Sequence, residues 1–306
     1  FLNWLLINGI WIFPRWEVKG AAIATAIGLC VGSVLAFVSL VRRHEGDMGF
    51  LRLSVKDDWR FSLPAARAVV KVGGNSMLEQ IALRIGFFLY ARLVADLGTQ
   101  AYASHVVCMQ FLNLSFTFAD GIGVASTSLV GQMLGRERPD LSHLYGKIAQ
   151  RIAVVGAVLL ASVIVIFRYP LVGLFTDDPT VARLSANVML IVALFQPLQM
   201  LSVITSGALR GAGDTKFVAR VMLICVAIIR PVLAFSAIRL ITQFFTPVYA
   251  EAAFAGAAAT LTYWLAYEAP EWALLGAWAA SLVDMALRMG LVMKRFNGGK
   301  WHSIKV

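Results

Sequence analysis

Apolar stretches of about 20 residues, the length a helix needs to cross a bilayer core about 30 Å thick, recur along most of the chain. These runs are unbroken and rich in Ala, Leu, Val and Gly, whereas strands of a barrel would alternate between apolar and polar residues, so the pattern favours helices. We expect membrane spans near residues 20–41, 64–95, 100–134, 149–174, 184–209, 217–242 and 272–293.

The composition supports this class. Hydrophobic residues make up 59% of the 306 residues and charged residues 14%, whereas soluble domains have about 45–50% and about 25%. The chain is therefore predicted to be all-α, a polytopic helical bundle in a membrane. Residues 1–13 are too short for a span, and we expect them to end a helix that starts before residue 1. Residues 244–267, bounded by Pro and Glu, are predicted to form an interfacial hairpin or lid.

The net charge of +10 reports topology. Sixteen of the 27 Lys and Arg residues lie at alternate loops, within residues 42–60, 136–151, 210–220 and 294–305, and the other loops hold only five. Because cytoplasmic loops carry an excess of Lys and Arg, these loops and the C-terminus are predicted to be cytoplasmic, in a multi-pass protein of the inner or plasma membrane. The charge is expected to contact membrane lipids and not nucleic acid.

Residues with catalytic or metal-binding chemistry are scattered. Three cysteines fall in predicted spans without metal or redox spacing, and the four histidines are not paired at ligand spacing. We therefore expect no metal site, no catalytic residues and no organic cofactor, and predict that the protein is not an enzyme.

Charged residues inside spans are costly and mark candidate functional positions. Glu79 and Arg84 lie near the middle of span 64–95, about 140° apart around the helix, so they do not pair with each other. Glu79 could face a cavity, where it would bind a proton or a cation. The alternative is that Glu79 pairs with a basic group on a neighbouring helix and only fixes the packing.

Three further sites are predicted in the other spans. Asp284 and Arg288 are four residues apart on one helix face and are expected to form a structural ion pair. Asp120 precedes a Gly-rich segment and could line a cavity. The pair Arg230 and Pro231 lies in mid-span, where proline is expected to kink the helix near residue 230 and provide a hinge.

Several short motifs, in order along the chain, carry a family resemblance. They are Gly20-Ala21-Ala22-Ile23-Ala24-Thr25, Leu97-Gly98-Thr99 with Tyr102-Ala103-Ser104-His105, Val130-Gly131-Gln132-Met133-Leu134-Gly135, Leu174-Phe175-Thr176, Leu209-Arg210-Gly211-Ala212-Gly213-Asp214-Thr215 and Gly299-Lys300-Trp301. The chain resembles the multidrug and toxic compound extrusion (MATE) family. The resemblance implies twelve helices in two six-helix lobes, with residues 1–60 as the end of the N-terminal lobe and the inter-lobe linker, and residues 61–306 as the C-terminal lobe and a short cytoplasmic tail.

The resemblance also implies a function. MATE proteins are secondary antiporters that export amphipathic, often cationic, organic compounds in exchange for H⁺ or Na⁺ by alternating access, and Glu79 matches a carboxylate that takes part in cation coupling. The sequence departs from the sodium-coupled pattern at the tenth helix, where Gln196 and Gln199 stand in a stretch without an acid. We expect Gln80, Asn113, Gln196 and Gln199 to line the cavity beside Glu79 in a monomer.

A second function stays open. A lipid-linked oligosaccharide flippase could have a similar bundle, with Arg84 and Arg230 as cations for a pyrophosphate headgroup. Converging Arg or Lys side chains in the cavity would favour the flippase, whereas isolated carboxylates with aromatic rings would favour cation export.

Overall fold

The fold is described from a computed structural model, and all of its regular structure is helical in the part that it describes, residues 5–6, 16–41, 62–254, 258–299 and 301. The chain divides into two compact units, 1–63 and 64–306. The first unit contains α2 (Glu17–Val41), the expected span after residue 20. The predicted remnant at 1–13 and the predicted linker before residue 61 lie mostly outside the described residues.

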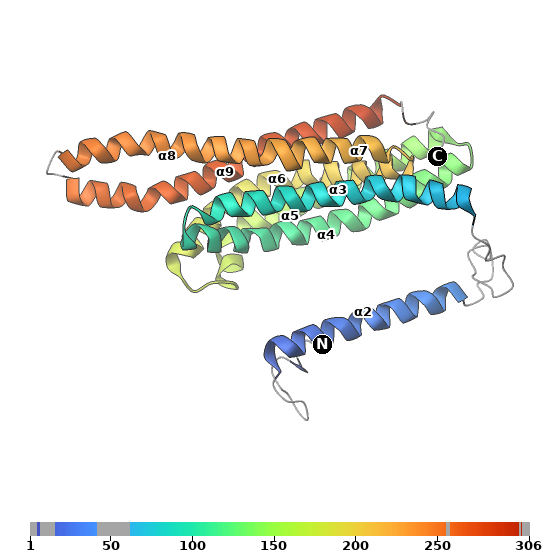
Figure 1. Cartoon of the computed structure of the whole chain (residues 1–306), viewed down its shortest axis with the longest axis horizontal. Helices are drawn as coiled ribbons and strands as arrows, with labels where there is room; N and C mark the ends of the chain where they lie inside the picture. The colour runs from blue at the N-terminus through green and yellow to red at the C-terminus, as the bar shows by residue number, and fades with distance from the viewer. Residues whose placement is uncertain (1–4, 7–15, 42–61, 255–257, 300, 302–306) are drawn as a thin grey trace. The chain divides into compact units, whose positions relative to one another are not determined.

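The second unit is a bundle of long helices (Figure 1). They are α3 (Leu63–Ala95), α4 (Thr99–Gly135), α5 (Pro139–Gly173), α6 (Pro179–Gly211), α7 (Thr215–Met222), the π-helical stretch η2 (Leu223–Ile229), α8 (Arg230–Phe254) and α9 (Ala258–Asn297). In the described part of the chain, six segments are long and apolar enough to cross a membrane. The chain is therefore a multi-pass membrane protein. The helix α3 is not among the six; it holds five charged residues, Arg67, Lys71, Glu79, Arg84 and Arg92.

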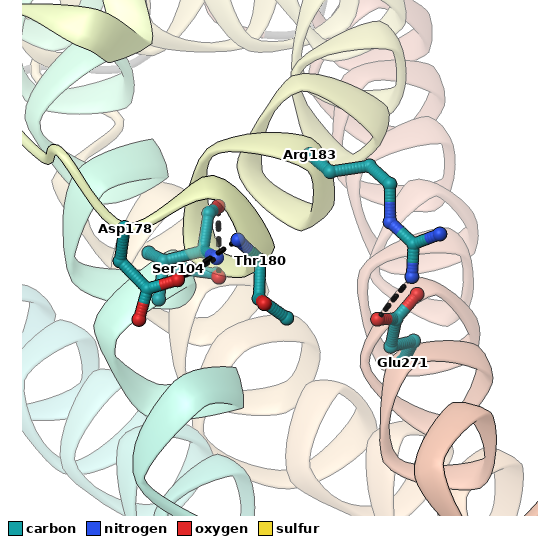
Figure 2. A network of polar contacts seen from close by, with 6 residues as sticks. Ser104, Asp178, Thr180, Arg183 and Glu271 are labelled. Carbon is teal, nitrogen blue, oxygen red and sulfur yellow. Dashed lines mark hydrogen bonds and ion pairs between the residues drawn. The ribbon is translucent and has the colours of Figure 1, made fainter. Parts of the chain in front are cut away.

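The helix α6 lies at the centre of the bundle. It packs against α4, α5 and α9. In its most apolar 18-residue segment, 67% of the residues are buried, whereas in that of α5 only 17% are. Its start is fixed by Asp178, whose carboxylate accepts from the backbone N–H of Thr180 at 2.8 Å (Figure 2). Pro179 follows at the first helical position, where its missing N–H costs nothing. Asp178 and Pro179 therefore fix where α6 begins, and its apolar side chains keep most of the helix buried.

Glycines let α4 and α6 touch along their backbones. A Cβ placed on Gly207 would lie 2.5 Å from the carbonyl oxygen of Gly123, and one on Gly211 would press on the backbone of Thr127. The Thr127 hydroxyl donates to the Gly207 carbonyl at 2.7 Å. Small residues at this spacing are the usual means of close helix contact in membranes. The Gly-rich segment after Asp120 is thus a packing surface.

The helix irregularity expected at Pro231 is present as η2. Proline cannot donate a backbone hydrogen bond, and the preceding turns widen so that the Arg230 N–H reaches the carbonyl of Cys225. On the adjacent helix α3, Gly86 leaves room for the Val226 carbonyl. The π-helical stretch therefore lies where α3 and η2 meet; its predicted role as a hinge stays a prediction.

The stretch 244–267 does not form a separate element. The backbone of α8 is helical to Phe254, and α9 starts at Ala258, so the two helices continue through the predicted hairpin or lid and reach past the ends of their neighbours (Figure 1). The predicted segment is thus built from the end of α8 and the start of α9, which pack against each other. Its interfacial position and its role as a lid stay predictions.

Candidate functional site

A cavity of about 430 Å³ opens in the second unit between α3, α4, α6, α7 and α9. Its wall combines carboxylates, guanidinium groups, amides and aromatic rings. The polar and aromatic lining residues are Glu79, Gln80, Arg84, Phe87, Asn113, Phe116, Thr117, Asp120, Ser206, Arg210 and Arg288. The structure therefore brings together five of the residues that the sequence pointed to, Glu79, Gln80, Arg84, Asn113 and Asp120.

Glu79 is buried in the cavity wall and forms an ion pair. Its Oε1 accepts from Nη1 of Arg210, in the last turn of α6, at 2.7 Å. Only 3% of Glu79 is exposed, whereas the Arg210 side chain is 24% exposed. Arg210 is therefore the basic partner on a neighbouring helix that was one of the two alternatives predicted for Glu79. Since the pair lines the cavity, the pairing does not remove Glu79 from contact with a ligand.

A second ion pair lies deeper, between α8 and α9. Nε of Arg230 donates to Oδ2 of Asp284 at 2.8 Å, Nη2 lies 2.7 Å from the same oxygen, and both residues are buried. The guanidinium of Arg230 also lies 5.2 Å from the ring centroid of Phe87. A hydrogen bond between two ionised groups is stronger than one between neutral groups.

The predicted ion pair between Asp284 and Arg288 is therefore wrong. The two share a helix face as expected, but Asp284 turns to Arg230 across the helix contact. Arg288 is 1% exposed; its Nη1 contacts the Met222 sulfur at 3.5 Å, and its Nε and Nη2 find no hydrogen-bond partner among the described residues. Arg288 thus brings a buried positive charge to the cavity wall.

Gln196 and Gln199 lie elsewhere, and their predicted place in the cavity is wrong. Both are fully buried within the packed faces of α6, and neither lines the cavity. Their side-chain amides have no partner among the described residues. Arg230 also misses the main cavity and borders a void of about 10 Å³ beside it. The amide positions depended on helix rotation, which the apolar pattern of α6 does not define because α6 is buried on nearly all sides.

Two cavity residues were missed. Arg210 lies in the Leu209–Thr215 motif, whose local pattern indicates only a helix end, and Arg288 was assigned to Asp284. With Arg84 they give the cavity three guanidinium groups against the carboxylates of Glu79 and Asp120. The cavity is thus of mixed sign, with two phenylalanine rings, and its charge alone does not decide between cation export and the flippase.

Comparison with known proteins gives the family. A model of the MatE family matches residues 76–236, more than half of the chain. The chain belongs to this family. The matched region holds the cavity residues of α3, α4, α6 and α7.

Relatives and a solved structure agree with the family. The chain is 27% identical over 304 residues to the probable multidrug resistance protein NorM of Thermotoga maritima, covering 99% of this chain and 58% of the relative. It is 30% identical over 234 residues to the probable multidrug resistance protein NorM of Mannheimia succiniciproducens, with 73% and 48% coverage. A MATE crystal structure in the bent conformation superposes with a TM-score of 0.71 at 16% identity, over 98% of this chain and 59% of that one.

The chain therefore spans about half the length of these relatives, and the MATE-type helical fold extends over nearly all of it. The relatives' names speak of drug resistance, so they do not favour the flippase.

Proposed function

We propose that this chain forms the C-terminal lobe, and the end of the N-terminal lobe, of a secondary antiporter that exports amphipathic organic compounds, often cations, in exchange for H⁺ or Na⁺. The proposal rests on the family, on the relatives named as multidrug resistance proteins, and above all on one observation. An ion pair between Glu79 and Arg210 lies in the wall of a cavity large enough for a small organic molecule.

The pair supplies a means of exchange. In this state Arg210 neutralises Glu79, and a bound organic cation or a coupling ion would have to take its place. A buried carboxylate tolerates only one such partner at a time without leaving a second charge uncompensated. Competition between an organic cation and H⁺ or Na⁺ for one carboxylate is the requirement for exchange.

The other cavity residues fit an amphipathic ligand. Phe87 and Phe116 offer apolar and cation-π contact, and Gln80 and Asn113 can orient polar groups of the ligand. Asp120, on α4, is the second acid in the cavity wall, after Glu79 on α3. The wall thus offers both polar and apolar contacts to an amphipathic molecule.

Coupling further requires that the ion binds the two access states with different affinity. The cavity offers one buried acid, Glu79, and one exposed acid, Asp120. A bound Na⁺ prefers several oxygen ligands, and a proton needs only one. The single buried acid is thus more readily used by a proton, and the experiment below separates the two ions.

The test is gradient-driven efflux from proteoliposomes. The complete open reading frame that encodes this chain is purified and reconstituted, and loss of ethidium fluorescence is followed after an imposed pH or Na⁺ gradient. Glu79→Gln is expected to abolish the response to the gradient while the protein stays folded.

The matched control is Glu271→Gln. Glu271 is also a glutamate paired with an arginine, Arg183, at 2.8 Å (Figure 2), but it does not line the cavity. It should keep wild-type efflux. Undiminished gradient-driven efflux in Glu79→Gln would remove Glu79 from the mechanism, and absence of ethidium transport by the wild type under either gradient would argue against drug antiport.

We also propose that the transporter lies in the inner or plasma membrane with a cytoplasmic C-terminus, because the basic loops cluster at one end of alternate helices.

A further inference from the structure

A second hollow lies on the outside of the bundle, between α5, α6 and α9. It is an open groove of about 540 Å³, distinct in its lining residues from the cavity around Glu79. Its lining combines the apolar residues Val154, Leu201 and Met293 with the polar residues His143, Gln150 and Asn297, and the two cations Lys147 and Arg151 of α5 form its rim.

The rim is positively charged. Lys147 and Arg151 are one helical turn apart, on the same side of α5, and both are exposed. Of the described residues, no carboxylate lines the groove. Two acids near this end of the bundle are engaged elsewhere, Asp140 with Arg138 and Asp214 with Arg295.

The depth of the rim matches a lipid headgroup. At about 1.5 Å per residue the 35 residues of α5 extend about 52 Å, so a core about 30 Å thick leaves about 11 Å at each end. Lys147 lies about 12 Å and Arg151 about 18 Å from the start of α5. The backbone of Lys147 is therefore at the edge of the hydrocarbon, and that of Arg151 lies about 6 Å deeper. Long Arg and Lys side chains extend toward the interface, so both cations can reach the phosphates.

The surface beyond the rim is apolar. Along α5, Val155, Val158 and Leu159 follow Arg151 and are each more than half exposed. Such side chains face acyl chains in a membrane. A molecule with a phosphate at one end and hydrocarbon at the other would thus meet complementary groups along the whole track.

We propose that this groove is a binding site for an anionic glycerophospholipid, with the phosphate held between Lys147 and Arg151 and an acyl chain lying along α5. Charge complementarity selects this occupant over a zwitterionic lipid or an organic cation, and basic pockets between helices at membrane depth are suited to such headgroups. The inference does not depend on the proposed antiport.

The test compares two charge-removing double variants of the purified, detergent-solubilised protein. Lys147→Gln with Arg151→Gln removes the rim. Lys216→Gln with Arg220→Gln removes the same residue types at the same spacing from the exposed face of α7, outside the groove. Binding of phosphatidylglycerol is titrated by native mass spectrometry, with phosphatidylcholine as the uncharged comparison and glycerol phosphate as a soluble competitor.

The rim variant should bind phosphatidylglycerol roughly 25-fold more weakly, since each cation near an anionic lipid is worth about five-fold. The Lys216 and Arg220 variant should bind phosphatidylglycerol as the wild type does. The swapped variant, Lys147→Arg with Arg151→Lys, keeps both positive charges and should also bind it as the wild type does. Equal losses in both double variants, or equal binding of phosphatidylcholine, would overturn the site. Full displacement by glycerol phosphate would show a free-phosphate site and overturn the lipid assignment.

Discussion

Adding one methyl group to Gly207 should separate α4 from α6. The new Cβ would lie 2.5 Å from the Gly123 carbonyl oxygen and 3.0 Å from its carbonyl carbon, and ordinary contact needs about 1 Å more. Both atoms belong to the backbone of a long helix, so no flexible side chain can move aside. The helices must part, and the bond of 2.7 Å from Thr127 to the Gly207 carbonyl would stretch beyond hydrogen-bond length.

The magnitude follows from three contributions. Overpacking of a core costs about 1–3 kcal/mol, loss of an interhelical hydrogen bond in a membrane costs about 0.6 kcal/mol, and alanine in place of glycine returns about 1 kcal/mol of helix propensity. Gly207→Ala should therefore lower stability by about 1–3 kcal/mol. At about 2–4 °C per kcal/mol for a domain of this size, the unfolding midpoint should fall by roughly 2–12 °C.

A thiol-reactive fluorophore measures the midpoint, because Cys108 and Cys225 are buried and react only on unfolding, whereas Cys30 is exposed and reacts at once. The control is Gly290→Ala in α9, where a Cβ would meet nothing within 4 Å. Gly290→Ala should match or slightly exceed the wild-type midpoint. If Gly207→Ala melts with Gly290→Ala, the close backbone contact of α4 and α6 does not stabilise the lobe.

Three further outcomes are expected. Asp284→Asn leaves Arg230 as an uncompensated buried charge and should cost about 3–5 kcal/mol in the same melting assay, while Asp140→Asn at an exposed pair should change the midpoint little; similar midpoints would show that the buried pair is not structural. Asp178→Ala removes the α6 cap and should cost about 1 kcal/mol; an unchanged midpoint would deny the cap a role. A green fluorescent protein fused after the last residue should fluoresce in cells, whereas an alkaline phosphatase fusion there should be inactive; the reverse pattern would invert the topology.

The helices could be predicted from the sequence because a segment that crosses the lipid bilayer needs a continuous run of apolar residues. Glycines and prolines then mark where helices begin or end, as Pro179 does for α6. The π-helical stretch before Pro231 follows from the N–H that proline lacks. Within the stretch 244–267 the sequence did not show that α8 and α9 extend into it, because a polar interruption in an apolar run does not by itself end a helix.

The partners of the buried charges could not be predicted. Glu79 and Arg210 are 131 residues apart, and nothing local shows which helix faces which. Asp284 illustrates the limit. Its spacing in the sequence permits an ion pair with Arg288, but the packing of α8 on α9 places Arg230 beside it instead. The positions of Gln196 and Gln199 failed for a related reason, because a helix buried all round has no polar face to indicate its rotation.

The claim that Glu79 is shared between Arg210, an organic cation and a coupling ion is tested most directly by equilibrium binding of tetraphenylphosphonium to the protein made from the complete open reading frame. Raising the proton or the Na⁺ concentration should weaken binding to the wild type. Binding to Glu79→Gln should be weaker throughout and insensitive to the coupling ion. The same ion-dependent loss of affinity in Glu79→Gln and in the wild type would contradict the central role of this carboxylate.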